Sequence, residues 1–116
     1  MDKLQGILCQ RIGIFYKDEK WKRIIFDEIA EYYRLLDMID YLSYAKWNAK
    51  ILLKDGTTIY FVRAEGQSRG QRFSKVIIQS GVEQSIIDVV IRPCVLPFAS
   101  TQCYVVDIYN DKKEII

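Results

Sequence analysis

The sequence predicts a small α/β domain, in which a mixed sheet is joined by one long helix and one short helix and contains a β-hairpin. Runs rich in β-branched and aromatic residues alternate with a long segment of helical periodicity, as in domains whose helices and strands share one sheet. Half of the 116 residues are apolar, which is enough for one hydrophobic core. No Pro-, Gly- or Ser-rich linker divides the chain, so residues 1–116 are predicted to form a single domain.

A strand and a long helix are expected first. Residues 7–16 (ILCQRIGIFY) favour a strand that bends at Gly13. Asp18 is a good N-cap, and the helix is expected over residues 19–42. Apolar side chains recur in this segment at spacings of three and four, as on the buried face of a helix. They are Trp21, Ile25, Ile29, Tyr32, Leu36 and Ile39.

The strongest local signal predicts a β-hairpin. Residues 49–54 and 57–62 favour strands, and Asp55-Gly56 between them can supply the positive φ angles of a type I′ turn. A two-residue turn of this type would set Leu53 opposite Thr58.

The remainder of the chain predicts a second helix between two strands. A polar loop over 64–72 precedes a buried strand over 73–78, a short helix over 82–91 that Pro93 ends, and a final strand over 103–109. The last seven residues are expected to fray.

Composition excludes several classes of protein. The chain has no histidine, which removes Ser-His-Asp and Cys-His catalysis and most zinc sites. Cys9, Cys94 and Cys103 are odd in number and scattered, so they favour a reducing compartment over a disulfide framework. No apolar run approaches the length of about 20 residues that a membrane span needs. We therefore expect a soluble, cytoplasmic protein without a metal or cofactor.

Basic residues gather in and around the loop that follows the hairpin. Residues 49–93 carry seven basic and four acidic side chains, whereas residues 1–48 carry eight of each. The candidate contacts to a polyanion are Arg63, Arg69, Gly70, Arg72 and Lys75. Arginine suits phosphate oxygens, and glycine lets the backbone approach a ligand closely. The same residues also fit an ordinary solvated surface loop.

Aromatic residues cluster near the end of the predicted long helix. Core packing can account for most of them, but an exposed subset would suit a protein interface, because Tyr and Trp bring a large area at low entropic cost. The candidate interface residues are Tyr33, Tyr41, Tyr44 and Trp47.

The run ILLKDGTTIYFVRAEGQSRGQRFSKVIIQ resembles the segment that leads to the Walker B strand in large terminase subunits of tailed phages. Those ATPases show a hairpin with an N/D-G-S/T turn, a polar loop with Arg-Gly, and an apolar strand that ends in Asp-Glu. Asp55-Gly56-Thr57, Arg69-Gly70 and residues 73–78 match these features in turn. On a wider alignment the resemblance covers residues 7–98.

The departures from that family concern its catalytic residues. The family's magnesium-binding Asp falls at Gln79 and its catalytic Glu at Ser80, and neither side chain can replace a carboxylate. The sequence also lacks the phosphate-binding motif G-x-x-x-x-G-K-[ST]. The resemblance therefore implies a non-hydrolytic relative of the terminase ATPase.

Two functions follow as expectations. The first is a non-catalytic interaction protein, phage-encoded, that acts as an inhibitor or accessory of a nucleic-acid-processing machine through protein contacts. The alternative is a nucleic-acid-binding module that uses the basic loop after the hairpin. Catalysis ranks third, because no nucleophile–base pair or metal cluster can be named. Self-association into a homo-oligomer is compatible with either function.

Overall fold

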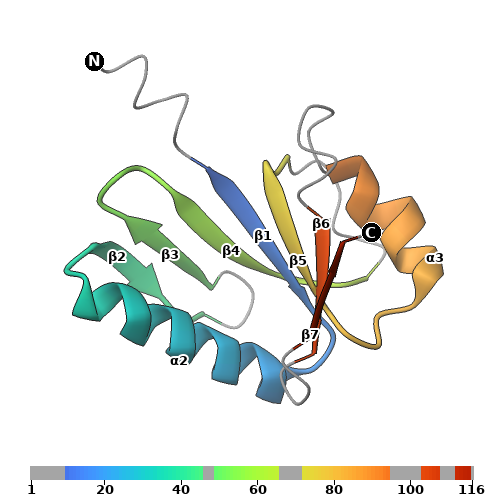
Figure 1. Cartoon of the computed structure of the whole chain (residues 1–116), viewed down its shortest axis with the longest axis horizontal. Helices are drawn as coiled ribbons and strands as arrows, with labels where there is room; N and C mark the ends of the chain where they lie inside the picture. The colour runs from blue at the N-terminus through green and yellow to red at the C-terminus, as the bar shows by residue number, and fades with distance from the viewer. Residues whose placement is uncertain (1–9, 46–48, 66–71, 95–102, 108–111, 116) are drawn as a thin grey trace.

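The structure is a computed structural model that describes residues 10–45, 49–65, 72–94, 103–107 and 112–115. These residues form a seven-stranded mixed sheet in the order β2-β3-β4-β1-β5-β6-β7, with one long and one short helix, which confirms the predicted fold class (Figure 1). The strands are β1 (Arg11–Tyr16), β2 (Ile39–Ser43), β3 (Lys50–Leu53), β4 (Thr58–Arg63), β5 (Lys75–Gln79), β6 (Cys103–Asp107) and β7 (Lys112–Ile115). The helices are α2 (Glu19–Leu35) and a short helical segment that begins with α3 (Gln84–Ile86).

The central strand is β1, which pairs in parallel with β4 on one side and with β5 on the other. The chain then builds outward in both directions. β2, β3 and β4 form an antiparallel meander, β5 pairs in parallel with β6, and β6 pairs with β7 in antiparallel register. The connection after β1 therefore leads to one side of the sheet, and the connection after β5 leads to the other.

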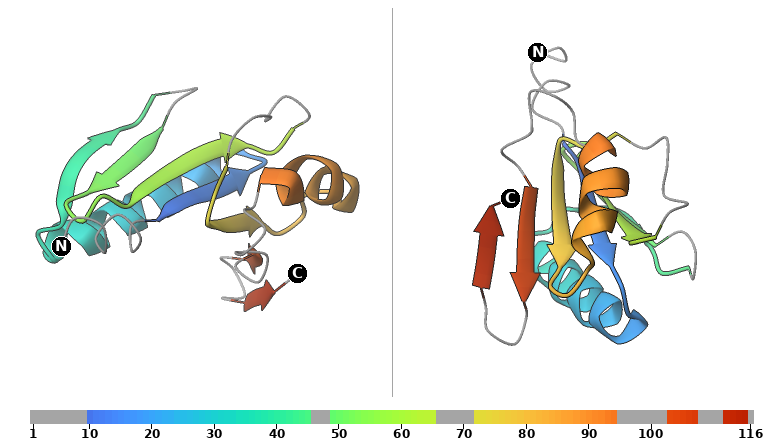
Figure 2. Two further views of the ribbon diagram at one scale, coloured as in Figure 1. Left: turned by 90° about the horizontal axis from the view of Figure 1, so that it is seen from above. Right: turned by 90° about the vertical axis from the view of Figure 1, so that its right-hand side faces the viewer.

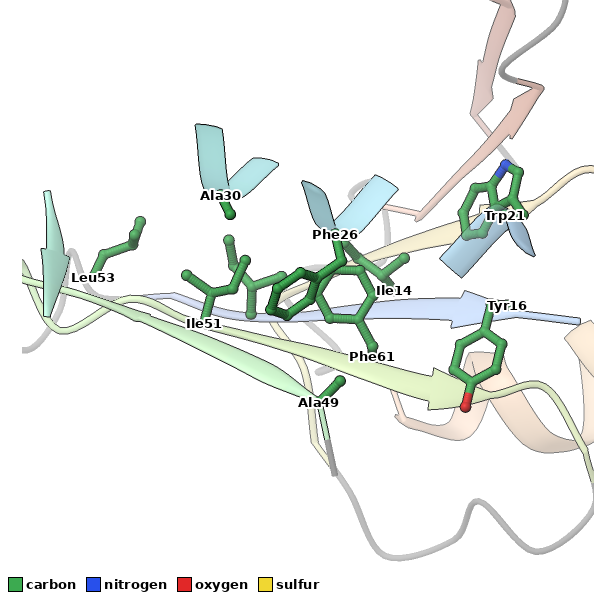
Figure 3. Packing of buried hydrophobic residues seen from close by; sticks show 10 residues of the cluster. Ile14, Tyr16, Trp21, Phe26, Ala30, Ala49, Ile51, Leu53 and Phe61 are labelled. Atoms are coloured by element: carbon green, nitrogen blue, oxygen red, sulfur yellow. The ribbon is translucent and has the colours of Figure 1, made fainter. Parts of the chain in front are cut away.

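Helix α2 covers one face of the sheet over β1–β4 (Figure 1). Asp18 caps it as predicted: its Oδ1 accepts the backbone N–H of Trp21 at 2.7 Å. Trp21, Phe26 and Ala30 point from the helix onto the sheet, where Ile14 and further apolar side chains meet them (Figure 3). This cluster is the larger of the two hydrophobic cores in the described residues.

A lysine is fully buried beside this core. The Lys22 ammonium lies 4.8 Å from the ring centroid of Tyr16, 4.9 Å from that of Tyr44 and 3.5 Å from a carboxylate oxygen of Glu19. Two ring faces and a carboxylate compensate for the loss of water around the charge.

The prediction that the helix continues to residue 42 is wrong. Asp37 adopts a left-handed conformation with φ 55°. The backbone N–H of Asp37 donates to the Arg34 carbonyl and that of Met38 donates to the Tyr33 carbonyl, the hydrogen bonds of a Schellman cap. The chain then turns into β2. The apolar periodicity continues past the true end because Ile39 returns to the same core from a strand.

The predicted hairpin forms between β3 and β4, but its turn type and register differ from the prediction. The N–H of Leu53 donates to the Thr57 carbonyl and the N–H of Gly56 donates to the Leu53 carbonyl. Gly56 has φ 92°, whereas Asp55 has no positive φ. The loop therefore has three residues, a type I turn followed by a glycine bulge, and Leu52 rather than Leu53 lies opposite Thr58.

The other face of β1 and β5 carries the second hydrophobic core. Phe15, Val76 and Ile78 pack there with Phe73 and with Ile91 of the short helical segment. The prediction that β1 bends at Gly13 is wrong, because the strand pairs continuously through this residue with both β4 and β5. A Cβ at this position would lie 2.8 Å from the Phe73 ring, so the absence of a side chain makes room for that ring.

The short helical segment runs beyond the predicted end at Pro93. After α3, a π-helical turn (Ile87–Ile91) and a 3-10 turn (Arg92–Cys94) follow. The N–H of Arg92 reaches back to the Ile87 carbonyl, and the Cys94 thiol donates to the Val90 carbonyl. The hydrogen bonding thus changes from a π-helical to a 3-10 pattern at Arg92. The missing N–H of Pro93 therefore does not end the segment.

Residues 112–115 form a strand, although the sequence predicts that the last seven residues fray. β7 lies beside β6 (Figure 2) and pairs with it in antiparallel register. In this register Asp107 is opposite Lys112. The sequence predicts the first strand over 7–16, and in the structure it begins at Arg11; residues 7–9 lie outside the described part. Residues 108 and 109 of the predicted last strand also lie outside it. The sequence of β7 is rich in charge, as is common for an edge strand that must not pair further.

Replacing Gly13 by alanine should lower the free energy of unfolding by about 1–3 kcal/mol, because the new methyl group meets the buried Phe73 ring. Chemical denaturation measures the change. In a Phe73→Leu background, which vacates part of that space, the same substitution should cost clearly less. An equal cost in both backgrounds would show that the contact with Phe73 is not the reason for the glycine.

Candidate functional site

The carboxyl ends of β1 and β5 form the first candidate site. In open α/β sheets, ligands bind where neighbouring parallel strands send their connections in opposite directions. Here β1 leads into α2 and β5 leads into α3, which pack on opposite faces of the sheet. Lys17, Asp18 and Gln79 come together at this point.

The side chain of Gln79 bridges the two strand ends. Its Oε1 accepts the backbone N–H groups of Lys17 at 2.8 Å and Asp18 at 3.3 Å. Its Nε2 donates to Oδ2 of Asp18 at 2.7 Å. At neutral pH an amide can accept and donate in this way, whereas an ionised carboxylate has no donor. Gln79 thus stabilises the loop between β1 and α2.

The hydrogen bonds also hold Asp18 in its charged form. The donation from Gln79, followed by that from the Trp21 backbone N–H, lowers the pKa of Asp18 below its ordinary value of 3.8. Both oxygens of the carboxylate therefore have protein donors, one for each. This arrangement closes the strand ends rather than presenting a carboxylate to a ligand.

A shallow cavity of about 300 Å³ lies beside the Asp18–Gln79 bridge. Lys17, Glu65 and Glu83 line it together with small and aliphatic residues. The Lys17 ammonium donates to the Gly81 carbonyl at 3.3 Å, which holds it across the turn after β5. The charges of this cavity are mixed, so they do not select one class of ligand.

The predicted basic residues do not form one patch. Arg63 is the last residue of β4, at the carboxyl end of the parallel strands. Its guanidinium lies 3.7 Å from Glu19 and 3.4 Å from Glu65. Lys75 is the first residue of β5, at the opposite, amino end of the parallel strands, and lines a groove beside α2. Arg72 lies near Lys75 in sequence, but its Nη1 donates to the Pro93 carbonyl at 2.7 Å. Arg69 and Gly70 lie outside the described residues.

The predicted interface tyrosines are also separated. Tyr33 and Tyr44 lie half-buried against the core beneath α2, where Tyr44 contacts Phe26 edge to face at 4.8 Å. The Arg23 guanidinium covers the ring of Tyr44 at 4.6 Å. Tyr41 lies in β2 and is 52% exposed. Trp47 lies outside the described residues.

An apolar groove beside α2 is a feature that sequence reasoning did not assign. It has a volume of about 300 Å³, and we call it the α2 groove. The residues that line it are Ile12, Ile14, Glu28, Ile29, Tyr32, Tyr33, Ile59, Lys75 and Ile77. The groove arises because α2 covers β1–β4, whereas Ile77 of β5 is only half-buried on the same face.

The rim of the α2 groove continues into exposed apolar residues. Tyr32 is 59% exposed, and Leu35, one turn further along the helix, is 77% exposed. Glu28, Tyr32 and Leu35 follow at spacings of four and three, so they share one flank of α2. The sequence contained only part of this signal, because Tyr32 belongs to the predicted apolar stripe whereas Leu35 lies outside it.

Comparison of the chain with protein-family models, curated proteins and solved structures finds no match. Within the described parts of the chain, no helix is long and apolar enough to cross a membrane. The described residues also contain no cluster of three His, Cys, Asp or Glu side chains placed to hold a metal ion. Cys94 is buried, and burial raises the pKa of its thiol.

Replacing Gln79 by glutamate should lower the free energy of unfolding at pH 7 by about 2–3 kcal/mol, because a buried donor is lost and two carboxylates are opposed. Thermal or urea unfolding as a function of pH tests this. The lowered pKa of Asp18 implies stabilisation above its ordinary pKa that is lost as the pH falls through the lowered value. The deficit of the variant should shrink near pH 4, where the introduced carboxyl regains a proton to donate.

Gln84 provides a matched control for this prediction. Its Nε2 also donates to a carboxylate, that of Asp88 at 3.0 Å, but the pair is exposed. Gln84→Glu should therefore change stability by less than about 0.5 kcal/mol. Equal effects of the two substitutions would contradict a structural role for Gln79.

Proposed function

We propose that this chain is a non-catalytic interaction protein that binds a protein partner through the α2 groove and the exposed flank of α2. The observation that carries the proposal is the continuous apolar surface formed by the groove together with Tyr32 and Leu35. Contiguous exposed apolar area of this kind is typical of protein contact sites. The closed Asp18–Gln79 bridge further supports binding over catalysis, because it uses the strand-end position for stability.

The groove suits an amphipathic helix of the partner. One such helix could lie beside α2 and insert apolar side chains spaced by three and four residues. Glu28 is exposed at the mouth of the groove, so a basic residue on the partner would complement it. Pairing of strands at the sheet edge is less favourable, because β2 is interrupted by a bulge between Ile39 and Tyr41 and exposes Asp40.

We further propose that the partner belongs to a nucleic-acid-processing machine and that the chain is a phage-encoded inhibitor or accessory of it. This part rests on the terminase resemblance of Asp55-Gly56-Thr57, Arg69-Gly70 and residues 73–78. A domain that resembles an ATPase segment in sequence but lacks its acids could occupy the place of that segment in an assembly.

Replacing Leu35 by glutamate should abolish capture of the partner from the native host, or weaken the purified complex about tenfold or more, because a charge enters the apolar contact. Affinity capture with quantitative mass spectrometry identifies the partner, and calorimetry of the purified pair measures the affinity. The side chain is 77% exposed, so the variant should fold normally.

Val89→Glu is the matched control, because Val89 is an apolar residue that is 71% exposed on the short helical segment. The partner should bind this variant like the wild-type protein. Retention of the partner by Leu35→Glu, or equal loss with both variants, would overturn the assignment of the α2 groove.

A further inference from the structure

The sheet has a second accessible face, on the side opposite α2. Alternate residues of β2, β3 and β4 point away from α2 and are half-buried or exposed, whereas their neighbours Ile51, Leu53 and Phe61 are buried under the helix. We call this surface the open face. It comprises Tyr41, Ser43, Lys50, Leu52, Thr58, Tyr60 and Arg11.

The strand register places these side chains in two rows. Ser43, Lys50 and Tyr60 lie opposite one another on β2, β3 and β4, and Tyr41, Leu52 and Thr58 form the next row. Directly opposed residues on one face have Cβ atoms about 4.5–5.5 Å apart. Lys50 is therefore beside Tyr60, and Tyr41 is at the edge of the sheet, about 14 Å from β1 for three strand spacings.

Arg11 is held on this face by its neighbours. Its guanidinium lies 4.7 Å from the ring centroid of Tyr60, Nη1 donates to the Tyr60 hydroxyl at 3.1 Å, and Nε donates to the Arg72 carbonyl at 2.9 Å. Phe73 supports the same group from the side, 5.9 Å from the guanidinium. A cation held in this way loses little entropy when it binds an anion.

The positive charge continues beyond Arg11. Arg72 is exposed and is fixed by its hydrogen bond to the Pro93 carbonyl. Lys50, Arg11 and Arg72 thus follow one another across the sheet, and none of the residues that define the open face is acidic. The nearest acid in these strands is Asp40, at the bulge in the edge strand β2.

We propose that the open face binds single-stranded nucleic acid. Lys50, Arg11 and Arg72 would contact successive phosphates, and Tyr41, whose ring is 52% exposed, would stack on a base. A cationic track beside an exposed aromatic ring is the combination by which proteins bind single strands without sequence preference. This site differs from the predicted basic loop: it omits Arg63 and Lys75 and includes Arg11 and Lys50. It does not depend on the α2 groove, which lies on the other face.

Fluorescence anisotropy with labelled oligo-dT and oligo-U of equal length, and with a duplex of mixed sequence, tests the proposal. Three phosphate contacts on a single strand predict a slope of about −2 for log K against log salt, hence a loss of about 15-fold between 50 and 200 mM. Tyr41→Ala should weaken single-strand binding about tenfold, because one stacked base is lost. Lys50→Ala should reduce the slope by about 0.7.

Two matched variants control for general effects. Tyr32→Ala removes a tyrosine of similar exposure from the α2 side, and Lys54→Ala removes a lysine from the same hairpin that is already paired with Asp37 at 3.3 Å. Both should bind single strands like the wild-type protein, and circular dichroism verifies folding. Absence of binding at 50 mM salt, tighter binding of the duplex than of the single strands, or equal losses with Tyr41→Ala and Tyr32→Ala would overturn the proposal.

Discussion

The double pairing of β1 is the constraint on which the rest of the structure depends. Because β4 and β5 bond to both of its edges, its side chains must be accommodated above and below the sheet in strict alternation. Ile14 and Tyr16 enter the core beneath α2, whereas Phe15 enters the core of the short helical segment. At Gly13 the Phe73 ring occupies the space that a side chain of β1 would otherwise fill. The same ring then supports Arg11, so one packing requirement extends from the core to the open face.

The ends of β1 and β5 show how a binding position can become a structural one. Doubly wound sheets bind their ligands at this point. Here Gln79 satisfies two backbone N–H groups and one carboxylate oxygen, and Asp18 uses its other oxygen to cap α2. These hydrogen bonds join β5, the loop after β1 and the start of the helix. The α2 groove and the open face lie away from this point, on the two faces of the sheet.

Both accessible surfaces have one origin, namely that each helix covers only part of a seven-stranded sheet. On the α2 side the uncovered part is apolar and forms a groove with Tyr32 and Ile77. On the other side it carries Lys50, Arg11 and exposed Tyr41. A protein segment and a nucleic-acid strand could occupy opposite faces at the same time, which would suit an accessory of a nucleic-acid-processing machine.

Local patterns in the sequence determined the fold class, the Asp18 cap and the hairpin, because a capping residue, a glycine turn and apolar periodicity act over a few neighbouring residues. They could not locate the end of α2, since Ile39 continues the apolar period while belonging to a strand. Nor could they group the site residues. Arg63 and Lys75 are close in sequence, but parallel pairing places them at opposite ends of the strands. Lys50 and Arg11 are far apart in sequence, but both lie beside Tyr60. Only the tertiary structure decides such groupings, because strand order and register depend on pairing across the whole chain.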